Sequence, residues 1–297
     1  MHRERIRTFL AGTAGLCIFA AAAFAQAPPA APFATHQLTT TVYWIEGGGG
    51  NSGVIIGDKG VIVIDAKTTP AGGKELVDDI AKLTPKRITT VILTHSDGDH
   101  VNGLASFPPG IKIIAHENNK KEQEEALAAG GRGAPPADHL PTDVVSKNKT
   151  TLKIDAIPFE LYHWAPAHTS GDLVVYLPAE KIVFTGDIIA AQLPDPLIHL
   201  EKHGSSEGWI TTTKGIVALN ATQFVPGHGN VQTKADVQKR LADAEAKRAK
   251  IKDLVTQGKS LEEIKTAVGD AAPAAGGRGP RFPTFTEVVY RELTNKS

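Results

Sequence analysis

The first half of this chain alternates short apolar runs with amphipathic and charged stretches, a pattern that predicts strands separated by helices. Apolar runs rich in β-branched residues indicate strands, whereas apolar residues at helical spacing indicate helices. The residues Asp58, Lys59 and Gly60 divide one long apolar run into two strands of a meander. Strands are therefore expected within residues 39–47, 52–65, 88–94 and 111–116, and helices within 72–83 and 117–130.

The second half begins after a Gly- and Pro-rich loop at 130–143 and repeats the strand pattern before it becomes helical. Strands are expected within residues 150–155, 157–164, 172–178 and 181–187, and helices within 234–258 and 260–269. The low-complexity insert "DAAPAAGGRGPRFP", 270–283, precedes a last short helix, and the role of residues 271–283 is left open. The pattern predicts an α/β chain in two roughly equal halves.

Residues 1–25 have the pattern of a secretory signal peptide. Three arginines among the first seven residues precede the apolar run "FLAGTAGLCIFAAAAFA", which ends on the small-residue cleavage pattern Ala23-Phe24-Ala25. Because this run is short for a membrane span, we expect a periplasmic or extracellular protein without stable membrane insertion after cleavage. The only cysteine, Cys17, would leave with the signal peptide. Any metal site must then use His, Asp and Glu side chains.

Composition narrows the range of partners. The chain has 297 residues, is 41% hydrophobic and has a formal net charge of +0. Balanced charge argues against a nucleic-acid partner, because nucleic-acid-binding domains usually present a basic face. A small-molecule substrate is the expectation that remains, and the sequence indicates no particular oligomeric state.

The stretch "VILTHSDGDHVNG", Val91 to Gly103, concentrates ionisable residues directly after an apparently buried strand. His95, Asp97, Asp99 and His100 fall where the strand gives way to a loop, which is where function tends to lie. Imidazole and carboxylate groups at this spacing suit a divalent metal. The alternative is a solvated polar turn in which an aspartate caps a helix that starts near Val101.

Three later stretches repeat this context and weaken the alternative. The sequence "APAHTSGD" places His168 in a loop just before a strand, "IVFTGD" ends an apolar strand on Asp187, and "FVPGHG" ends another on His228. A single histidine is more often structural than a ligand. Four such junctions in one chain favour a metal centre.

These four motifs, in this order and at these separations, resemble the metal motifs of the metallo-β-lactamase superfamily. The resemblance covers roughly residues 39–233 and implies a four-layer αβ/βα sandwich: two facing β-sheets flanked by helices, with a two-metal site at one edge. Together with the signal-peptide pattern, this predicts a signal peptide at 1–25, a flexible segment at 26–38, the core at 39–233 and a C-terminal helical segment at 234–297 that packs on or extends the core. The implied ligands are His95, Asp97 and His168 for one metal, Asp99, His100 and His228 for the other, and Asp187 as a bridge, as in the glyoxalase II-like branch.

Position 97 departs from the family pattern, which usually has histidine there. A carboxylate still ligates, but Asp97, Asp99, Asp187 and a bridging hydroxide would together offset two divalent cations fully. Such a cluster should acidify a bound water less. Zinc is the expected metal, while the oxygen ligand moves the preference towards iron or manganese, as in the flavodiiron branch. A site with one metal, with Asp97 too short to ligate, is the alternative.

The resemblance implies hydrolysis of an ester, lactone, lactam or related bond by a metal-bound hydroxide, which Asp99 would help to orient. Three alternatives remain: a β-lactamase proper, an iron-dependent redox enzyme of the same fold, and a non-catalytic metal-binding protein. True metallo-β-lactamases usually have cysteine or serine at the Asp187 position. His199 and His203 follow Asp187 in a segment that tends to shape the substrate pocket, and they are candidates for substrate contact.

Overall fold

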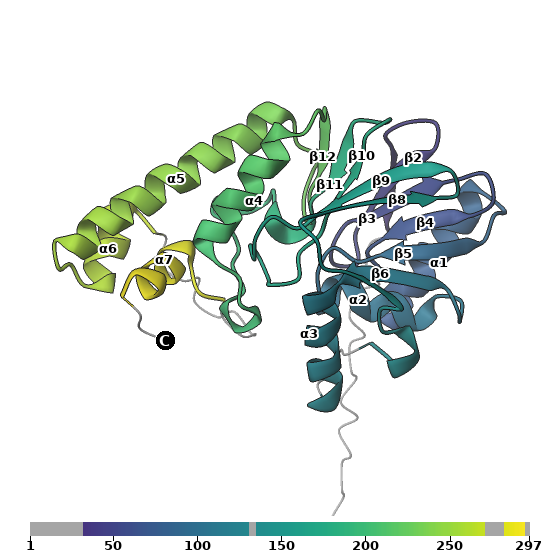
Figure 1. Cartoon of the computed structure of the whole chain (residues 1–297), viewed down its shortest axis with the longest axis horizontal. Coiled ribbons are helices and arrows are strands. Elements are labelled where there is room, and N and C mark those ends of the chain that lie inside the picture. Colours follow the sequence, from purple (N-terminus) through teal and green to yellow (C-terminus); the bar gives the residue numbers. More distant parts are fainter. Residues whose placement is uncertain (1–31, 131–134, 271–281, 295–297) are drawn as a thin grey trace, which may run out of the picture. The chain divides into compact units, whose positions relative to one another are not determined.

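The computed structural model describes residues 32–130, 135–270 and 282–294, whose strands form two sheets (Figure 1). The first sheet has the strand order β1-β2-β3-β4-β5-β6-β7 and changes from antiparallel to parallel pairing at β4. Its strands are β1 (Ala34–Gln37), β2 (Val42–Glu46), β3 (Ser52–Ile56), β4 (Val61–Ile64), β5 (Ile88–Ile92), β6 (Lys112–His116) and β7 (Asp143–Val145).

The second sheet has the order β12-β11-β10-β9-β8, in which only β11 and β12 pair in parallel. Its strands are β8 (Lys149–Ile154), β9 (Ile157–Tyr162), β10 (Val174–Leu177), β11 (Ile182–Phe184) and β12 (Gln223–Val225). The parallel strands end in loops at the same edge, so the topology alone brings distant loops together.

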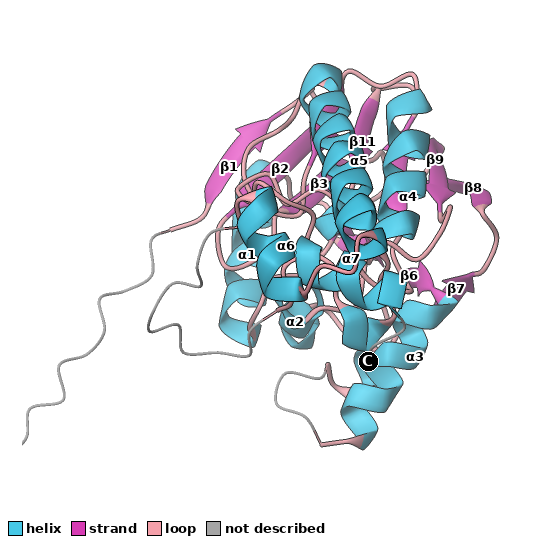
Figure 2. Ribbon diagram, turned by 90° about the vertical axis from the view of Figure 1, so that its left-hand side faces the viewer, coloured by secondary structure: helices cyan, strands magenta, loops and turns pink. Residues whose placement is uncertain are grey.

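Helices cover the outer faces of both sheets, as Figures 1 and 2 show. The helix α1 packs against the first sheet, while α4, α5, α6 and α7 share one apolar core with the second. The helices are α1 (Pro70–Leu83), α2 (Gly98–Val101), α3 (Glu117–Ala128), α4 (Ser206–Ala218), α5 (Lys234–Thr256), α6 (Leu261–Val268) and α7 (Phe285–Thr294). Among the residues described, none of these helices combines the length and apolar content needed to cross a bilayer.

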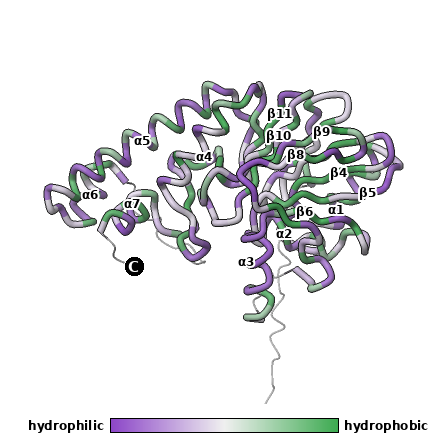
Figure 3. The backbone as a smooth tube through the Cα atoms, in the orientation of Figure 1, coloured by the Kyte–Doolittle hydropathy of each residue, from purple (hydrophilic) through white to green (hydrophobic). Residues whose placement is uncertain are grey.

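The four layers follow from alternation along the strands. Successive side chains of a strand point to opposite faces. In β4, Val61 and Val63 contact the α1 layer, whereas Ile62 and Ile64 face the other sheet. Figure 3 shows hydrophobic residues along the strands and a largely hydrophilic α3. Both faces of the central strands are therefore buried, which confirms the predicted four-layer αβ/βα sandwich.

Three elements differ from the sequence expectations. Residues 34–37 lie in the segment expected to be flexible, yet they form β1, in which His36 stacks on Trp44 at 4.2 Å between ring centroids. The strand β7 begins within the predicted loop 130–143. The helix α4 was not predicted, because two glycines and three threonines give it low helix propensity. Its buried Trp209 and Ile216 supply tertiary packing that outweighs that propensity.

The C-terminal helices begin where expected. Thr233 and Asp236 form a capping box at the start of α5, and Ser260 and Glu263 form another at the start of α6. The predicted signal peptide lies outside the described residues, as do residues 271–281 of the low-complexity insert.

Candidate metal centre

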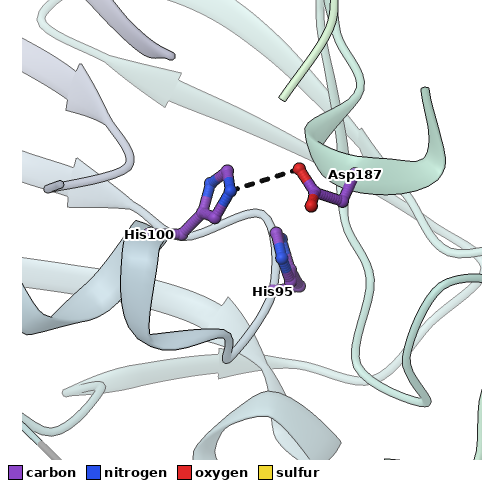
Figure 4. A group of neighbouring side chains, drawn as sticks. All are labelled: His95, His100 and Asp187. Carbon is purple, nitrogen blue, oxygen red and sulfur yellow. Dashed lines mark ion pairs between the residues drawn. The ribbon is translucent and has the colours of Figure 1, made fainter. Parts of the chain in front are cut away.

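The four motifs found in the sequence lie together at one edge of the two sheets. The first occupies the loop after β5 together with α2, and the second lies between β9 and β10. The third follows β11 in a short 3-10 turn (Gly186–Ile188), and the fourth follows β12. Figure 4 shows His95 and His100 from the first motif facing Asp187 from the third. Segments more than 130 residues apart therefore form one cluster.

Backbone hydrogen bonds hold these loops against one another. Leu173 N donates to Thr94 O at 2.6 Å, which ties the second motif to the first. Gly227 N donates to Gly186 O at 2.8 Å, which ties the fourth to the third. The positions of the side chains are thus set by rigid strand ends and by contacts between loops.

His95, Asp97 and His168 form one candidate ligand group. Their ligand atoms lie within 4.8 Å of one another. Asp97 Oδ2 is 3.0 Å from His168 Nε2 and 3.9 Å from His95 Nε2. Asp97 occupies the N-cap position of α2, but its side chain makes no capping hydrogen bond. The Asp97 side chain therefore does not act as the cap of α2.

Asp99, His100 and His228 form a second candidate group, also with ligand atoms within 4.8 Å. Asp99 Oδ2 is 3.0 Å from His228 Nε2 and 3.8 Å from His100 Nε2. The Asp99 side chain is 33% exposed, whereas His100 is fully buried. This group is therefore the part of the cluster that solvent reaches through Asp99.

Asp187 lies between the two groups. Its Oδ1 is 3.2 Å from His100 Nε2, and its Oδ2 is 3.4 Å from His228 Nε2 and 3.9 Å from His168 Nε2. One carboxylate thus faces both groups, which is the arrangement expected of a bridging ligand.

Three buried polar atoms at the centre of this cluster make no well-formed hydrogen bond: His95 Nε2, His100 Nε2 and Asp187 Oδ1, the last two of which face each other at 3.2 Å. Buried polar atoms are almost always satisfied, because leaving them unpaired costs free energy. These atoms are of the types that coordinate divalent cations, and they point towards the same space. The residues present therefore fit one or two metal ions.

Buried partners orient the candidate ligands through their other ring nitrogens. His100 Nδ1 lies 2.8 Å from Asp65 Oδ2, and the same carboxylate accepts hydrogen bonds from the Thr94 backbone N at 2.8 Å and Oγ1 at 2.6 Å. His168 Nδ1 lies 2.9 Å from Leu197 O. Such contacts fix the ring orientation of metal-ligating histidines.

The electrostatics of the cluster favour ionised carboxylates. Burial by itself would raise the pKa of Asp187, but His100 and His228 outweigh it and hold that pKa well below its usual value. Burial would lower the pKa of His168, yet the hydrogen bond to Asp97 and the charge of Asp187 raise it to about 9. Cation binding would therefore displace protons from histidines while the carboxylates are already charged.

The glycine-rich segment 47–51 joins β2 to β3 and packs on the cluster. Gly50 N donates to Asp99 O at 3.3 Å, and Asn51 N donates to Gly227 O at 2.7 Å. The segment therefore connects the first motif to the fourth.

The two histidines proposed for substrate contact have different surroundings. His199 Nδ1 lies 3.2 Å from Asp97 Oδ1, and its ring meets Phe282 edge-on at 4.8 Å between centroids. His203 is exposed and ends a 3-10 turn (Leu200–Lys202) with a left-handed backbone. His199 thus borders the cluster, whereas no described contact joins His203 to it.

Three other histidines lie apart from the cluster. His116 stacks on His163 at 4.0 Å between centroids, and His139 pairs with Asp138 at 2.9 Å. None of these three histidines belongs to a candidate ligand group of the described residues.

Sequence reasoning missed three residues that support the cluster: Asp65, Lys202 and Glu122. Asp65 ends the apolar run of β4, a position that resembles Asp187 at the end of β11 and could have drawn attention to it. Lys202 contacts Asp97 Oδ1 at 2.6 Å, and Glu122 of α3 accepts hydrogen bonds from Ser96 and Ser170. Neither Lys202 nor Glu122 carries a local sequence signal.

The fold and this site define a class of protein. The model of the metallo-beta-lactamase superfamily matches residues 45–228, which is more than half of the chain. The chain belongs to the metallo-β-lactamase superfamily, whose members are generally metal-dependent hydrolases.

Relatives of this chain have several functions. It is 27% identical over 196 residues to the alpha subunit of 2,4-dinitroanisole O-demethylase from Nocardioides sp., covering 65% of this chain and 57% of that subunit. It is 27% identical over 189 residues to the type 2 metallo-beta-lactamase of Bacillus cereus, covering 61% and 67% respectively.

Solved structures share the fold at low identity. An inverting sec-alkylsulfatase from Pseudomonas sp. superimposes with a TM-score of 0.69 at 17% identity, covering 89% of this chain and 51% of that one. A metallo-beta-lactamase from Pontibacter korlensis gives a TM-score of 0.61 at 18% identity, covering 72% and 99%. The chain thus spans little more than half the length of the demethylase subunit and about half that of the sulfatase.

Proposed function

We propose that this chain is a hydrolase that uses two divalent cations, with zinc the expected metal. His95, Asp97 and His168 would hold one cation and Asp99, His100 and His228 the other, with Asp187 facing both groups. The observation that carries the proposal is the set of three buried ligand-type atoms, His95 Nε2, His100 Nε2 and Asp187 Oδ1, that lie between the two groups without a well-formed hydrogen bond. Both groups have imidazole and carboxylate donors, which zinc, iron and manganese accept.

The cations, when bound, would supply a water of lowered pKa as nucleophile and positive charge to stabilise the developing oxyanion. Residues of the chain would orient the ligands and the attacking water. Asp65 and Leu197 O keep the rings of His100 and His168 in place. Asp99, the carboxylate of the cluster most open to solvent, is positioned to accept a proton from the attacking water or to orient it.

The substrate proposed is a small molecule with an ester, lactone, lactam or related bond. The name of one relative, a type 2 metallo-beta-lactamase, supports the lactam within this range. The predicted signal peptide at 1–25 leads us to propose that the protein meets its substrate in the periplasm or outside the cell.

Alanine variants of the ligands test this proposal. Replacing His100, Asp187 or His228 with alanine should remove at least one metal per chain and lower hydrolysis by several orders of magnitude, because positioning and charge are lost together. Metal content is measured by elemental analysis, and activity on a panel of esters, lactones and lactams.

His139→Ala is the matched control, since His139 is also buried and paired with an aspartate but lies outside the ligand groups. It should leave the metal content unchanged. A His228→Ala protein that keeps its full metal content would refute the assignment. A purified wild type with bound iron and no hydrolysis would favour redox chemistry instead.

A further inference from the structure

The two oxygens of the Asp97 carboxylate have separate partners. Oδ2 faces the histidines of its ligand group, at 3.0 Å from His168 Nε2. Oδ1 faces away from them and contacts Lys202 Nζ at 2.6 Å and His199 Nδ1 at 3.2 Å. The carboxylate therefore presents one oxygen to the cluster, while protein donors hold the other.

Lys202 is itself held firmly. Its Nζ also donates to Ser96 Oγ at 2.8 Å, and Ser96 Oγ donates in turn to Glu122. The backbone of Lys202 is fixed by Ser170 N, which donates to its carbonyl at 2.7 Å. Its side chain is only 25% exposed, so solvent screens the contact with Asp97 less than on an open surface.

Within the described part of the chain, Lys202 forms an ion pair with one carboxylate of the cluster, that of Asp97. Among the described residues, the ion pairs of Asp99 and Asp187 are with histidines alone, whereas Asp97 also has the ammonium group of Lys202. Asp97 also places a negative charge where the superfamily pattern usually has histidine, which binds metal as a neutral ligand. The positive charge of Lys202 therefore lies beside the negative charge that Asp97 adds to the cluster.

We infer that Lys202 is the positioning residue and charge partner of Asp97, the aspartate proposed as metal ligand at position 97. By holding Oδ1, it leaves Oδ2 as a one-oxygen ligand directed towards His95 and His168. By offsetting the carboxylate charge, it gives this group the same net charge as three neutral histidines. The inference rests on the proposed metal-binding function.

The presence of Lys202 changes the effect on metal binding that we expect of a histidine at position 97. From the sequence alone, histidine would restore the family pattern and improve the site. With Lys202 present, a histidine at position 97 leaves the Lys202 ammonium group beside the cation without a carboxylate partner. The two positive charges then repel each other. Position 97 and position 202 should therefore depend on each other, and a double-mutant cycle measures such a dependence.

The test compares Asp97→His, Lys202→Met and the double variant with the wild type, using the full chain and zinc alone. Zinc affinity is measured by competition with a chromophoric chelator. Asp97→His should bind its weaker zinc on the order of tenfold less tightly than the wild type, a usual size of coupling between contacting residues. Lys202→Met should bind zinc at least as tightly as the wild type, and the double variant should return to the wild-type affinity.

The absorption spectrum of the cobalt(II)-loaded protein provides a second readout, because it reports ligand geometry without activity. Lys202→Met should change this spectrum, since a freed Oδ1 lets the carboxylate turn, whereas Lys202→Arg should preserve it. Lys239→Met is the matched control, because it removes an ion pair with Asp243 on the exposed surface of α5. It should leave both the affinity and the spectrum unchanged.

Equal zinc affinities of Asp97→His and the double variant, or an unchanged cobalt spectrum in Lys202→Met, would overturn the inference alone. If Asp97→His does not fold, the spectra of Lys202→Met and Lys202→Arg decide. The metal content of Asp97→Ala tests the proposed metal-binding function itself. If Asp97→Ala keeps the metal content of the wild type, Asp97 is no ligand, and both the ligand assignment at this position and the inference fail.

Discussion

At the scale of single residues, the most unusual group outside the ligands is the fully buried Lys67. Its Nζ donates to Ile45 O at 2.7 Å and to Gly50 O at 2.9 Å, and it lies 5.0 Å from the centroid of the Phe33 ring. Burial lowers the pKa of Lys67 from 10.5 to about 7, although nearby Asp65 acts in the opposite direction. This lysine attaches the glycine-rich segment 47–51 to the end of β4.

The lowered pKa of Lys67 predicts how stability depends on pH. Between about pH 7 and 10.5 the unfolded chain keeps a proton on Lys67 that the folded chain releases, so the free energy of unfolding rises with pH. The stability of the wild type relative to Lys67→Met should therefore increase by up to about 1.4 kcal/mol per pH unit within this window. Denaturant unfolding at several pH values between 7 and 10 measures this difference.

Lys86→Met is the control for this prediction. Lys86 Nζ also donates to a backbone carbonyl, that of Gly57 at 2.7 Å, but the residue is exposed. Its substitution controls for the loss of a lysine that donates to a backbone carbonyl from the surface. A constant difference between wild type and Lys67→Met would contradict a lowered pKa.

At the scale of elements, the connection between β2 and β3 packs directly against the candidate ligands. A Cβ at Gly50 would lie 2.3 Å from His100 Cε1, far closer than van der Waals contact, so only glycine fits without displacement of the ring. Glycine is therefore required at position 50 because the backbone there lies close to His100, a candidate ligand. The connection and the first motif must move together.

Gly50→Ala should consequently weaken metal binding by displacing His100 from its position beside Asp187. Zinc affinity by chelator competition checks this, and a loss of about tenfold to a hundredfold is expected, as when the support of a metal ligand is removed. Gly72→Ala is the control, because the nearest atoms to its Cβ would be at 3.4 Å and the residue lies in the first turn of α1. Equal zinc affinities in the two variants would show that the segment does not position His100.

At the scale of the whole molecule, the C-terminal helices belong to the same compact unit as the sheets, since residues 32–297 do not divide further. Phe285, Val288 and Val289 of α7 lie in one apolar cluster with Trp209 of α4 and Phe224 of β12. Ser206 N, at the start of α4, donates to Glu292 Oε1 at 2.7 Å. The helices therefore support the segment between Asp187 and His228 from outside.

Phe285→Ala should lower the free energy of unfolding by about 3–5 kcal/mol, the cost of removing a buried phenylalanine side chain. Chemical denaturation followed by fluorescence and by circular dichroism should give one coincident transition, because the unit is cooperative. Phe282→Ala is the control, since Phe282 is 41% exposed and should change stability little. Two separate transitions would instead show that the C-terminal helices unfold independently.

Local pattern was enough to predict much of this fold. Alternation and apolar runs located β4, β5, β10 and α5, because strands buried on both faces and capped helices have strong periodic signatures. The same local context, a junction between a strand and a loop that contains His or Asp, identified all seven candidate ligands. They converge because β5 of the first sheet and β11 and β12 of the second end at the edge where the loop before β10 also lies.

Tertiary structure decided what local pattern could not. The helix α4 forms because Trp209 and Ile216 are buried, against the propensity of its own sequence. Lys202 becomes the partner of Asp97 only because the segment after Asp187 folds back over the first motif, 105 residues earlier in the chain. The sequence by itself determined which side chains could bind metal, since their types and spacing are local. The charge around them was decided by contacts between segments far apart in the chain, which no local pattern records.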